Sequence, residues 1–98
     1  MNYRHANKRL QRIDEEAGYT GGYSANIVEA FRRRMQAIRA AVNETDFYQL
    51  KSLHFEKLKG QRRHQRSMRL NDQFRLILEI EKGPRGNVAV VVGIEDYH

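Results

Sequence analysis

The sequence predicts an α+β fold in which N-terminal helices pack against a small antiparallel sheet. Apolar residues recur at helical spacing in the first half of the chain, whereas every second residue is apolar near its end. A chain of 98 residues can form one core but not two, so we expect a single domain over residues 1–98. Helices that precede a sheet cover one of its faces and leave the other face free for function.

The first half of the chain predicts a short strand and two helices. The strand spans residues 2–5, and the helix after it has its apolar side chains at Leu10, Ile13 and Ala17. Ser24 is a typical N-cap for the second helix, and Asn43 is expected to end that helix. The apolar positions of the second helix are Ile27, Val28, Phe31, Met35, Ile38 and Val42.

The second half of the chain predicts a connecting segment and then three strands. The connection runs over residues 44–60 and includes one helical turn after Thr45. The strands, in which apolar residues alternate with others, are expected at residues 66–70, 74–81 and 88–94. Asn71-Asp72 and the Gly-Pro-Arg-Gly of residues 83–86 are typical hairpin turns, so these strands should form an antiparallel meander.

Positive charge is concentrated in one segment of the sequence. The chain carries 18 Lys and Arg against 12 Asp and Glu, and its pI is about 10.0. Residues 51–71 contain seven of the basic residues and a single acid, Glu56, so they hold the whole net charge of +6. Such a segment is typical of a surface that binds a polyanion, and nucleic acid is the expected partner.

Several classes of protein are excluded by composition. Cysteine is absent, which rules out disulfides, thiolate metal sites and a thiol nucleophile. The four histidines show no zinc-binding spacing, so we expect neither a metal nor a cofactor. The N-terminus lacks the apolar core of a secretory signal, and no stretch is long enough to span a membrane. The expected location is therefore the cytoplasm.

Three short motifs, in their order and spacing, resemble one family. They are Leu58-Lys59-Gly60, the hairpin Ser-Met-Arg-Leu-Asn-Asp-Gln-Phe-Arg of residues 67–75, and the terminal Asp96-Tyr97-His98. Together they are similar to the HigB-like toxins of the RelE superfamily, which belong to type II toxin-antitoxin systems of the plasmid maintenance killer type. The resemblance implies a microbial RNase fold, a helix-turn-helix antitoxin of the HigA kind as partner, and cleavage of mRNA, usually on the ribosome.

The resemblance also implies which residues line the active cleft. The residues at the family's motif positions are Lys59, Arg69, Asn71, Arg75, Asp96, Tyr97 and His98. One position departs from the family, because many relatives have a histidine three residues before the lysine and this chain has Glu56 there. His54 lies two residues earlier and is a candidate to contact the substrate instead.

These residue types suit RNA cleavage without a metal. The reaction needs a base for the 2′-OH, stabilisation of the charge on the phosphorane and a proton for the leaving 5′-oxygen. Arg69 and Arg75 are expected to stabilise that charge, since the guanidinium fork matches phosphate oxygens. The acid and base roles stay open between Tyr97 and His98. Phosphate contacts without base specificity are expected from Lys57, Arg62, Arg63 and Arg66.

Two other functions remain open on the sequence. The basic face would also serve a non-catalytic nucleic-acid-binding module, although binding alone does not call for a Tyr-His pair beside the arginines. The second alternative is a degenerate toxin that still binds its antitoxin but has lost activity. The departure from the family at Glu56 makes this alternative possible. Replacement of Arg75 separates the endoribonuclease from both, since only the enzyme loses its effect on growth.

Overall fold

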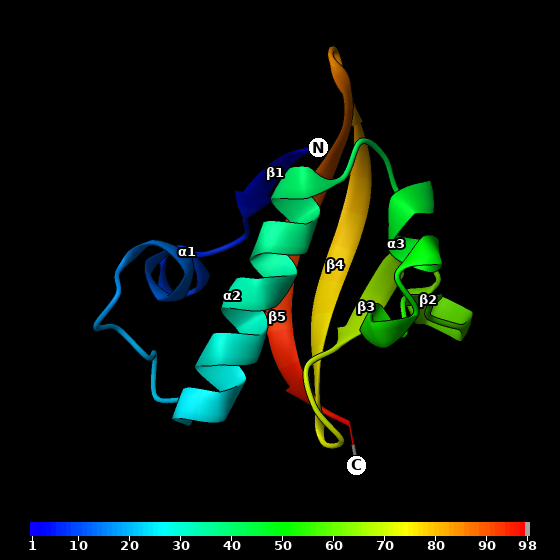
Figure 1. The fold of residues 1–98 in the computed structure, drawn as a ribbon. Coiled ribbons are helices and arrows are strands. Elements are labelled where there is room, and N and C mark those ends of the chain that lie inside the picture. Colours follow the sequence, from blue (N-terminus) through cyan, green and yellow to red (C-terminus); the bar gives the residue numbers. More distant parts are fainter. Residues whose placement is uncertain (98) are drawn as a thin grey trace.

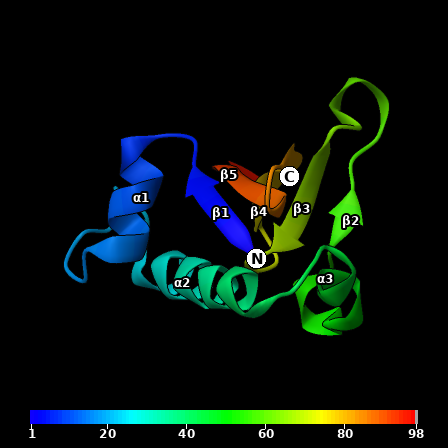
Figure 2. The same cartoon turned by 90° about the horizontal axis from the view of Figure 1, so that it is seen from above.

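The chain forms a sheet that helices cover on one face (Figures 1 and 2). The computed structural model describes residues 1–97. Its strands are β1 (Asn2–His5), β2 (Glu56–Lys57), β3 (Gln65–Arg69), β4 (Phe74–Gly83) and β5 (Gly86–Asp96). Its helices are α1 (Lys8–Glu15), α2 (Ala25–Ala40) and α3 (Thr45–Gln49), with short 3₁₀ turns at η1 (Lys51–Leu53) and η2 (Gly60–Arg62). Within residues 1–97, no helix is long and apolar enough to cross a bilayer.

The sheet is mixed, and its strand β1 precedes the helices. The prediction of a purely antiparallel sheet that follows the helices is therefore wrong in both respects. The strand order is β1-β5-β4-β3-β2, and β1 lies parallel to β5 while the other neighbours are antiparallel. The four residues of β1 are too few for their pattern to reveal a partner. They pair with the free side of β5, from Asn2 opposite Val88 to His5 opposite Val91, and the intervening helices and hairpin provide the crossover that a parallel pair requires.

Helix α2 begins as the sequence predicts and ends earlier. The Ser24 hydroxyl accepts a hydrogen bond from the Ile27 amide at 3.4 Å. The helix ends at Ala40 rather than at Asn43, whose side chain instead accepts from the Thr45 amide at the start of α3. Val42 therefore lies beyond the helix, and its predicted place on the apolar face is wrong because 81% of it is exposed.

Helix α1 is shorter than its apolar pattern suggests. Asn7 caps it by accepting from the Leu10 amide at 3.0 Å, and Leu10 and Ile13 are buried as predicted. The helix ends at Glu15, so Ala17 lies outside it and is exposed, contrary to the expectation. Arg32 of α2 donates to the Ile13 carbonyl at 2.9 Å, which joins the two helices.

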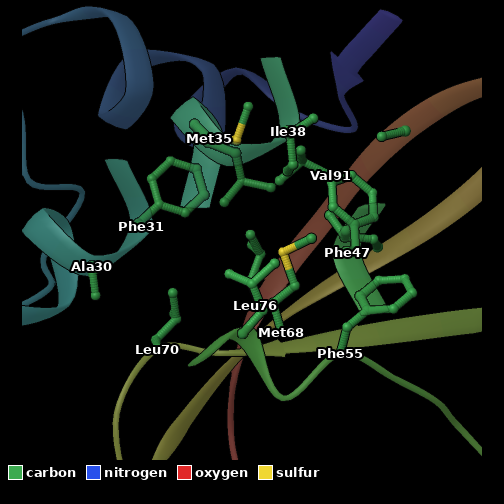
Figure 3. Packing of buried hydrophobic residues seen from close by; sticks show 14 of the residues in the cluster. Ala30, Phe31, Met35, Ile38, Phe47, Phe55, Met68, Leu70, Leu76 and Val91 are labelled. Atoms are coloured by element: carbon green, nitrogen blue, oxygen red, sulfur yellow. The ribbon is translucent and has the colours of Figure 1, made fainter. Parts of the chain in front are cut away.

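The core lies between α2, α3 and the covered face of the sheet (Figure 3). Phe31, Met35 and Ile38 of α2 and Phe47 of α3 are fully buried. They pack in one cluster with strand residues that include Met68, Leu76, Leu78, Ala89 and Val91. Burial of each large apolar side chain contributes about 1.5–3 kcal/mol, so this cluster holds α2 on the sheet.

A β-bulge in β5 changes which face the end of that strand presents. Ile77 pairs with Gly93 and Leu78 with Val91, so Val92 is an extra residue without a partner. The regular alternation expected for residues 88–94 is therefore wrong. Ala89 and Val91 face the helices before the bulge, and Ile94 packs against the same core after it. As a result, the odd-numbered residues after the bulge face away from the helices.

Candidate active site

Arg69 and Arg75 lie directly opposite each other at one end of the sheet. They are register partners on β3 and β4, on the face opposite the helices. The next pair toward the turn is hydrogen bonded, since the Leu70 amide donates to the Phe74 carbonyl at 2.9 Å. Arg69 and Arg75 therefore form a non-hydrogen-bonded pair, in which side chains lie closest. Two guanidinium groups thus arise from neighbouring points on the open face.

Arg75 is held by groups from three other segments. Its Nη2 donates to the His54 carbonyl oxygen at 2.6 Å, and the same atom lies 3.5 Å from Oε1 of Glu56. The guanidinium carbon lies 5.4 Å from the centre of the Tyr97 ring, a cation–π distance. Only 14% of the Arg75 side chain is exposed, and its buried Nε has no hydrogen-bond partner among residues 1–97. The guanidinium is therefore fixed in orientation, and its Nε–H is a buried donor that residues 1–97 leave unused.

An open hollow of about 270 Å³ surrounds these arginines. Its lining residues are His54, Arg69, Asn71, Asp72, Arg75 and Tyr97. His54 has a left-handed backbone with φ of 46°, which is uncommon for a residue other than glycine and turns its carbonyl toward Arg75. Arg69 donates to the carboxylate of Asp72, which is almost fully exposed. A phosphate that enters this hollow would compete with that carboxylate for Arg69.

A second hollow adjoins the first and shares Tyr97 with it. It measures about 310 Å³ and is lined by Glu56, Lys57, Leu58, Lys59, Arg62 and Tyr97. Figure 2 shows the connection between β2 and β3, which carries several of these residues, rising from the sheet on the side away from the helices. Arg62 crosses back to β5 and bonds Glu95 at 2.6 Å, which raises the pKa of Arg62. Basic side chains therefore continue from the arginine pair along one surface.

The β3–β4 turn holds the last described residue of the chain. Gln73 accepts a hydrogen bond from the Tyr97 amide at 2.7 Å, and its own side chain donates to Oδ2 of Asp96 at 2.9 Å. Asn71 accepts from the amides of Gln73 and Phe74 at 2.8 and 2.7 Å. The sequence predicts that Asn71 and Asp96 contact the substrate. In the structure their side chains form hydrogen bonds within the turn and between the turn and β5.

Two other residues that the sequence singled out do not join this group. Arg66 shares the helix-covered face with Met68 and pairs with Glu44 at 3.1 Å. Arg63 is exposed on the loop after η2 and lines neither hollow. His98 lies outside the described residues.

Three residues that were not among the predicted site residues contribute to the site. Glu56, noted only as a departure from the family pattern, faces Arg75. Gln73 holds the end of the chain, and Arg34 of α2 donates from Nε to the Arg69 carbonyl at 2.7 Å. Burial of Arg34, followed by the charges of Arg33 and Arg69, lowers its pKa. The sequence does not predict these contacts of Arg34 and Gln73, since both depend on the tertiary fold.

Among residues 1–97, no group of three or more His, Asp or Glu side chains is close enough to hold a metal ion.

Comparison with protein families identifies the chain. A family model described as "RelE-like toxin of type II toxin-antitoxin system HigB" matches residues 3–98. The chain belongs to the HigB-like toxin family. The fold agrees, because the solved structure of a YoeB/ParE toxin from Agrobacterium tumefaciens is similar with a TM-score of 0.63, covering 100% of both chains at 13% identity. That identity is low enough for the likeness to concern the fold alone. No curated protein matches the sequence.

As a HigB-like toxin, the chain is the toxin of a type II toxin-antitoxin system, and its partner is an antitoxin. The three motifs of the sequence resemblance map onto one region of the fold. The hairpin motif supplies Arg69 and Arg75, the terminal motif supplies Tyr97, and Lys59 lines the adjoining hollow.

Proposed function

We propose that this HigB-like toxin is a metal-independent endoribonuclease that cleaves mRNA on the ribosome, in the cytoplasm. The observation that carries the proposal is the convergence of Arg69, Arg75 and Tyr97 on one hollow of the open sheet face. Cations that are fixed before substrate binds stabilise developing charge without reorganisation during the reaction. The arrangement suits a phosphodiester whose non-bridging oxygens gain negative charge as the 2′-oxygen attacks the phosphorus.

Arg75 and Arg69 have different parts in this mechanism. Arg75 is tied to the His54 carbonyl and is mostly buried, so it offers a fixed contact for one phosphate oxygen. Arg69 is more exposed and becomes available when Asp72 moves aside. Lys57, Lys59 and Arg62 line the adjoining hollow and suit the phosphates of neighbouring nucleotides.

The general acid and base come from a small group of candidates. Tyr97 lies beside Arg75, which brings a phenol that can exchange a proton close to the site of the phosphate. His98 remains the other candidate that the family motif supplies, because its imidazole exchanges protons near neutral pH. Glu56 is a third, since its carboxylate lies 3.5 Å from Arg75 and lines the hollow next to Tyr97. A carboxylate at this place can accept the proton of the 2′-OH.

Growth and cleavage assays test the proposal. Expression of the chain alone should arrest bacterial growth, and co-expression of its antitoxin, which we propose is a helix-turn-helix protein of the HigA kind, should relieve the arrest. Deletion of His98 should abolish the arrest while thermal melting and antitoxin co-purification are preserved. Full toxicity of that deletion would remove His98 from the mechanism.

A chelator separates this mechanism from metal catalysis. Cleavage of a minimal RNA without ribosomes should continue in excess EDTA, whereas ribosome-dependent cleavage must be measured with the ribosomes' magnesium intact. Loss of turnover in EDTA with recovery on adding a divalent ion would contradict the proposal.

A second candidate is a toxin that binds RNA without cutting it. The observation in its favour is that site cations are already paired with carboxylates in the free chain, as in Arg62–Glu95 and Arg69–Asp72. Such a protein would bind RNA with a steep salt dependence and give no cleavage products. Wild-type cleavage that Arg75→Ala removes excludes this candidate.

A further inference from the structure

We propose that Gln73 is a positioning residue that fixes Tyr97 in the active site. This inference rests on the proposed function, since it concerns the residue that brings Tyr97 to the reacting phosphate. Gln73 makes two polar contacts that join the β3–β4 turn to the end of β5. Its carbonyl accepts from the Tyr97 amide at 2.7 Å, and its side-chain amide donates to Asp96 Oδ2 at 2.9 Å.

Tyr97 needs such a contact because the sheet no longer holds it. The pairing of β4 with β5 ends at Phe74 opposite Asp96, so Tyr97 lies one residue beyond the ladder. Residues at a chain end are mobile unless something docks them. Arg75 also stacks on the Tyr97 ring at 5.4 Å, and Arg62 lines the same hollow as Tyr97, but neither fixes a geometry as closely as a hydrogen bond does.

The turn that carries Gln73 is itself rigid. The amides of Leu70 and Asn71 both donate to the Phe74 carbonyl, at 2.9 and 3.3 Å. Asn71 closes the turn from inside with its two side-chain bonds to the amides of Gln73 and Phe74. The carbonyl of Gln73 is therefore an acceptor of fixed direction. Figure 1 shows the result, with the red end of β5 beside the yellow β3–β4 turn.

The same turn sets the arginines, so one small loop orders the whole site. Arg69 precedes the turn and Arg75 follows it, as register partners. Gln73 lies between these two arginines in the turn and binds the Tyr97 amide. The distance from Tyr97 to Arg75 therefore depends on the hydrogen bond between Gln73 and Tyr97. Catalytic groups that shift by about 1 Å can lose on the order of a hundredfold in rate. Gln73 thus acts through Tyr97 and does not need to touch the RNA.

Two variants and a polarity swap test the role. Gln73→Ala removes the donor to Asp96 and keeps the backbone acceptor, whereas Gln73→Glu places a second carboxylate against Asp96. The single-turnover cleavage rate should fall about tenfold in the first and further in the second, with the Kd for a non-cleavable RNA changed less than twofold. The double variant Gln73→Glu with Asp96→Asn restores the bond with its polarity reversed, so it should recover most of the rate. Gln36→Ala, at an exposed position on α2, is the matched control and should leave the rate unchanged.

A readout independent of cleavage completes the test. The chain has five tyrosines, so ¹⁵N-tyrosine labelling gives five amide signals, and that of Tyr97 should exchange with D₂O at least tenfold faster in Gln73→Glu than in the wild type. The inference about Gln73 is overturned, and the proposed function is not, by either of two results. One is unchanged exchange of the Tyr97 amide in Gln73→Glu, and the other is an active wild type whose cleavage rate both Gln73 variants retain. A wild-type chain that exchanges as expected but never cleaves RNA overturns the proposed function and leaves the contact between Gln73 and Tyr97 standing.

Discussion

The two faces of the sheet are built from alternate residues of the same strands, yet they follow opposite rules. On the covered face Met68 and Leu76 are completely buried among apolar side chains of α2 and α3. On the open face their sequence neighbours Arg69 and Arg75 carry charge and pair with acids. Adjacent residues in the sequence thus have different roles, because one packs in the core and stabilises the fold while its neighbour carries a charge that suits catalysis.

Unsatisfied polar atoms sharpen this difference. Within residues 1–97, the buried side-chain polar atoms without a partner are Oγ of Ser67 and Nε of Arg75. Both lie on the open face, at diagonal positions of the β3–β4 ladder. Buried polar atoms normally have partners, and exceptions tend to occur at functional sites. The covered face contributes stability, whereas the open face keeps donors free at some cost in stability.

The largest effect is expected from Arg75→Ala. Loss of one fixed cation at the reacting phosphate should lower the single-turnover cleavage rate by on the order of a hundredfold or more. The melting temperature should fall as well, because the His54 carbonyl and Glu56 lose their partner, so the rate is measured well below it. Arg75→Lys keeps the charge without the fork and should give an intermediate rate. A cleavage rate within twofold of wild type in Arg75→Ala would contradict the assignment.

The neighbouring substitution Leu76→Ala should have the opposite outcome. Leu76 is fully buried, so its truncation should lower the free energy of unfolding by about 2–5 kcal/mol in urea titrations. Cleavage per folded molecule, measured well below the melting temperature, should stay near the wild-type rate. If Leu76→Ala lost activity as severely as Arg75→Ala while still folded, the two faces would not be independent.

A smaller effect is expected from the basic hollow. Replacing Lys57 and Lys59 together by Gln should reduce the slope of log affinity against log salt for single-stranded RNA by about 1.4, or about 0.7 for each lost phosphate contact. The matched control replaces Lys82 and Arg85 by Gln, since both are exposed near the far end of the β4–β5 hairpin. Equal changes in the two double variants would indicate a general charge effect and no defined RNA path.

The smallest effect is expected from Asp72→Asn. This change frees Arg69 from its exposed ion pair, a contact usually worth about 0.2–1 kcal/mol. RNA affinity should therefore rise about two- to fivefold, measured by fluorescence anisotropy at low salt. Glu29→Gln, on the exposed side of α2, makes the same change in net charge away from the site. Weaker binding in Asp72→Asn would show that the carboxylate helps to hold the RNA.

The candidate site was predictable where sequence neighbours stay spatial neighbours. A tight turn places Arg69 and Arg75 on adjacent strands whatever the rest of the fold does, and the structure has them as register partners. Arg66 shows the limit of that reasoning. It was grouped with the basic loop, but strand alternation turns it to the helix side, where Glu44 pairs with it.

The sequence by itself determined the elements whose causes are local. The N-cap Ser24, the apolar spacing of α2 and the two hairpin turns act within a few residues, so the α+β class and most element positions follow from them. The tertiary structure decided what depends on partners far along the chain. The pairing of β1 with β5, the contact of Arg34 with Arg69 and the docking of Tyr97 on Gln73 are of this kind.

The bulge at Val92 shows the physical reason for that division. With unbroken alternation from Val91, which faces the core, Glu95 and Tyr97 would also face the helices. The extra residue reverses the alternation and brings Tyr97 to the face of Arg75. A run of valines has the same composition with or without a bulge, so only the register against β4 decides on which side of the sheet the terminal motif lies.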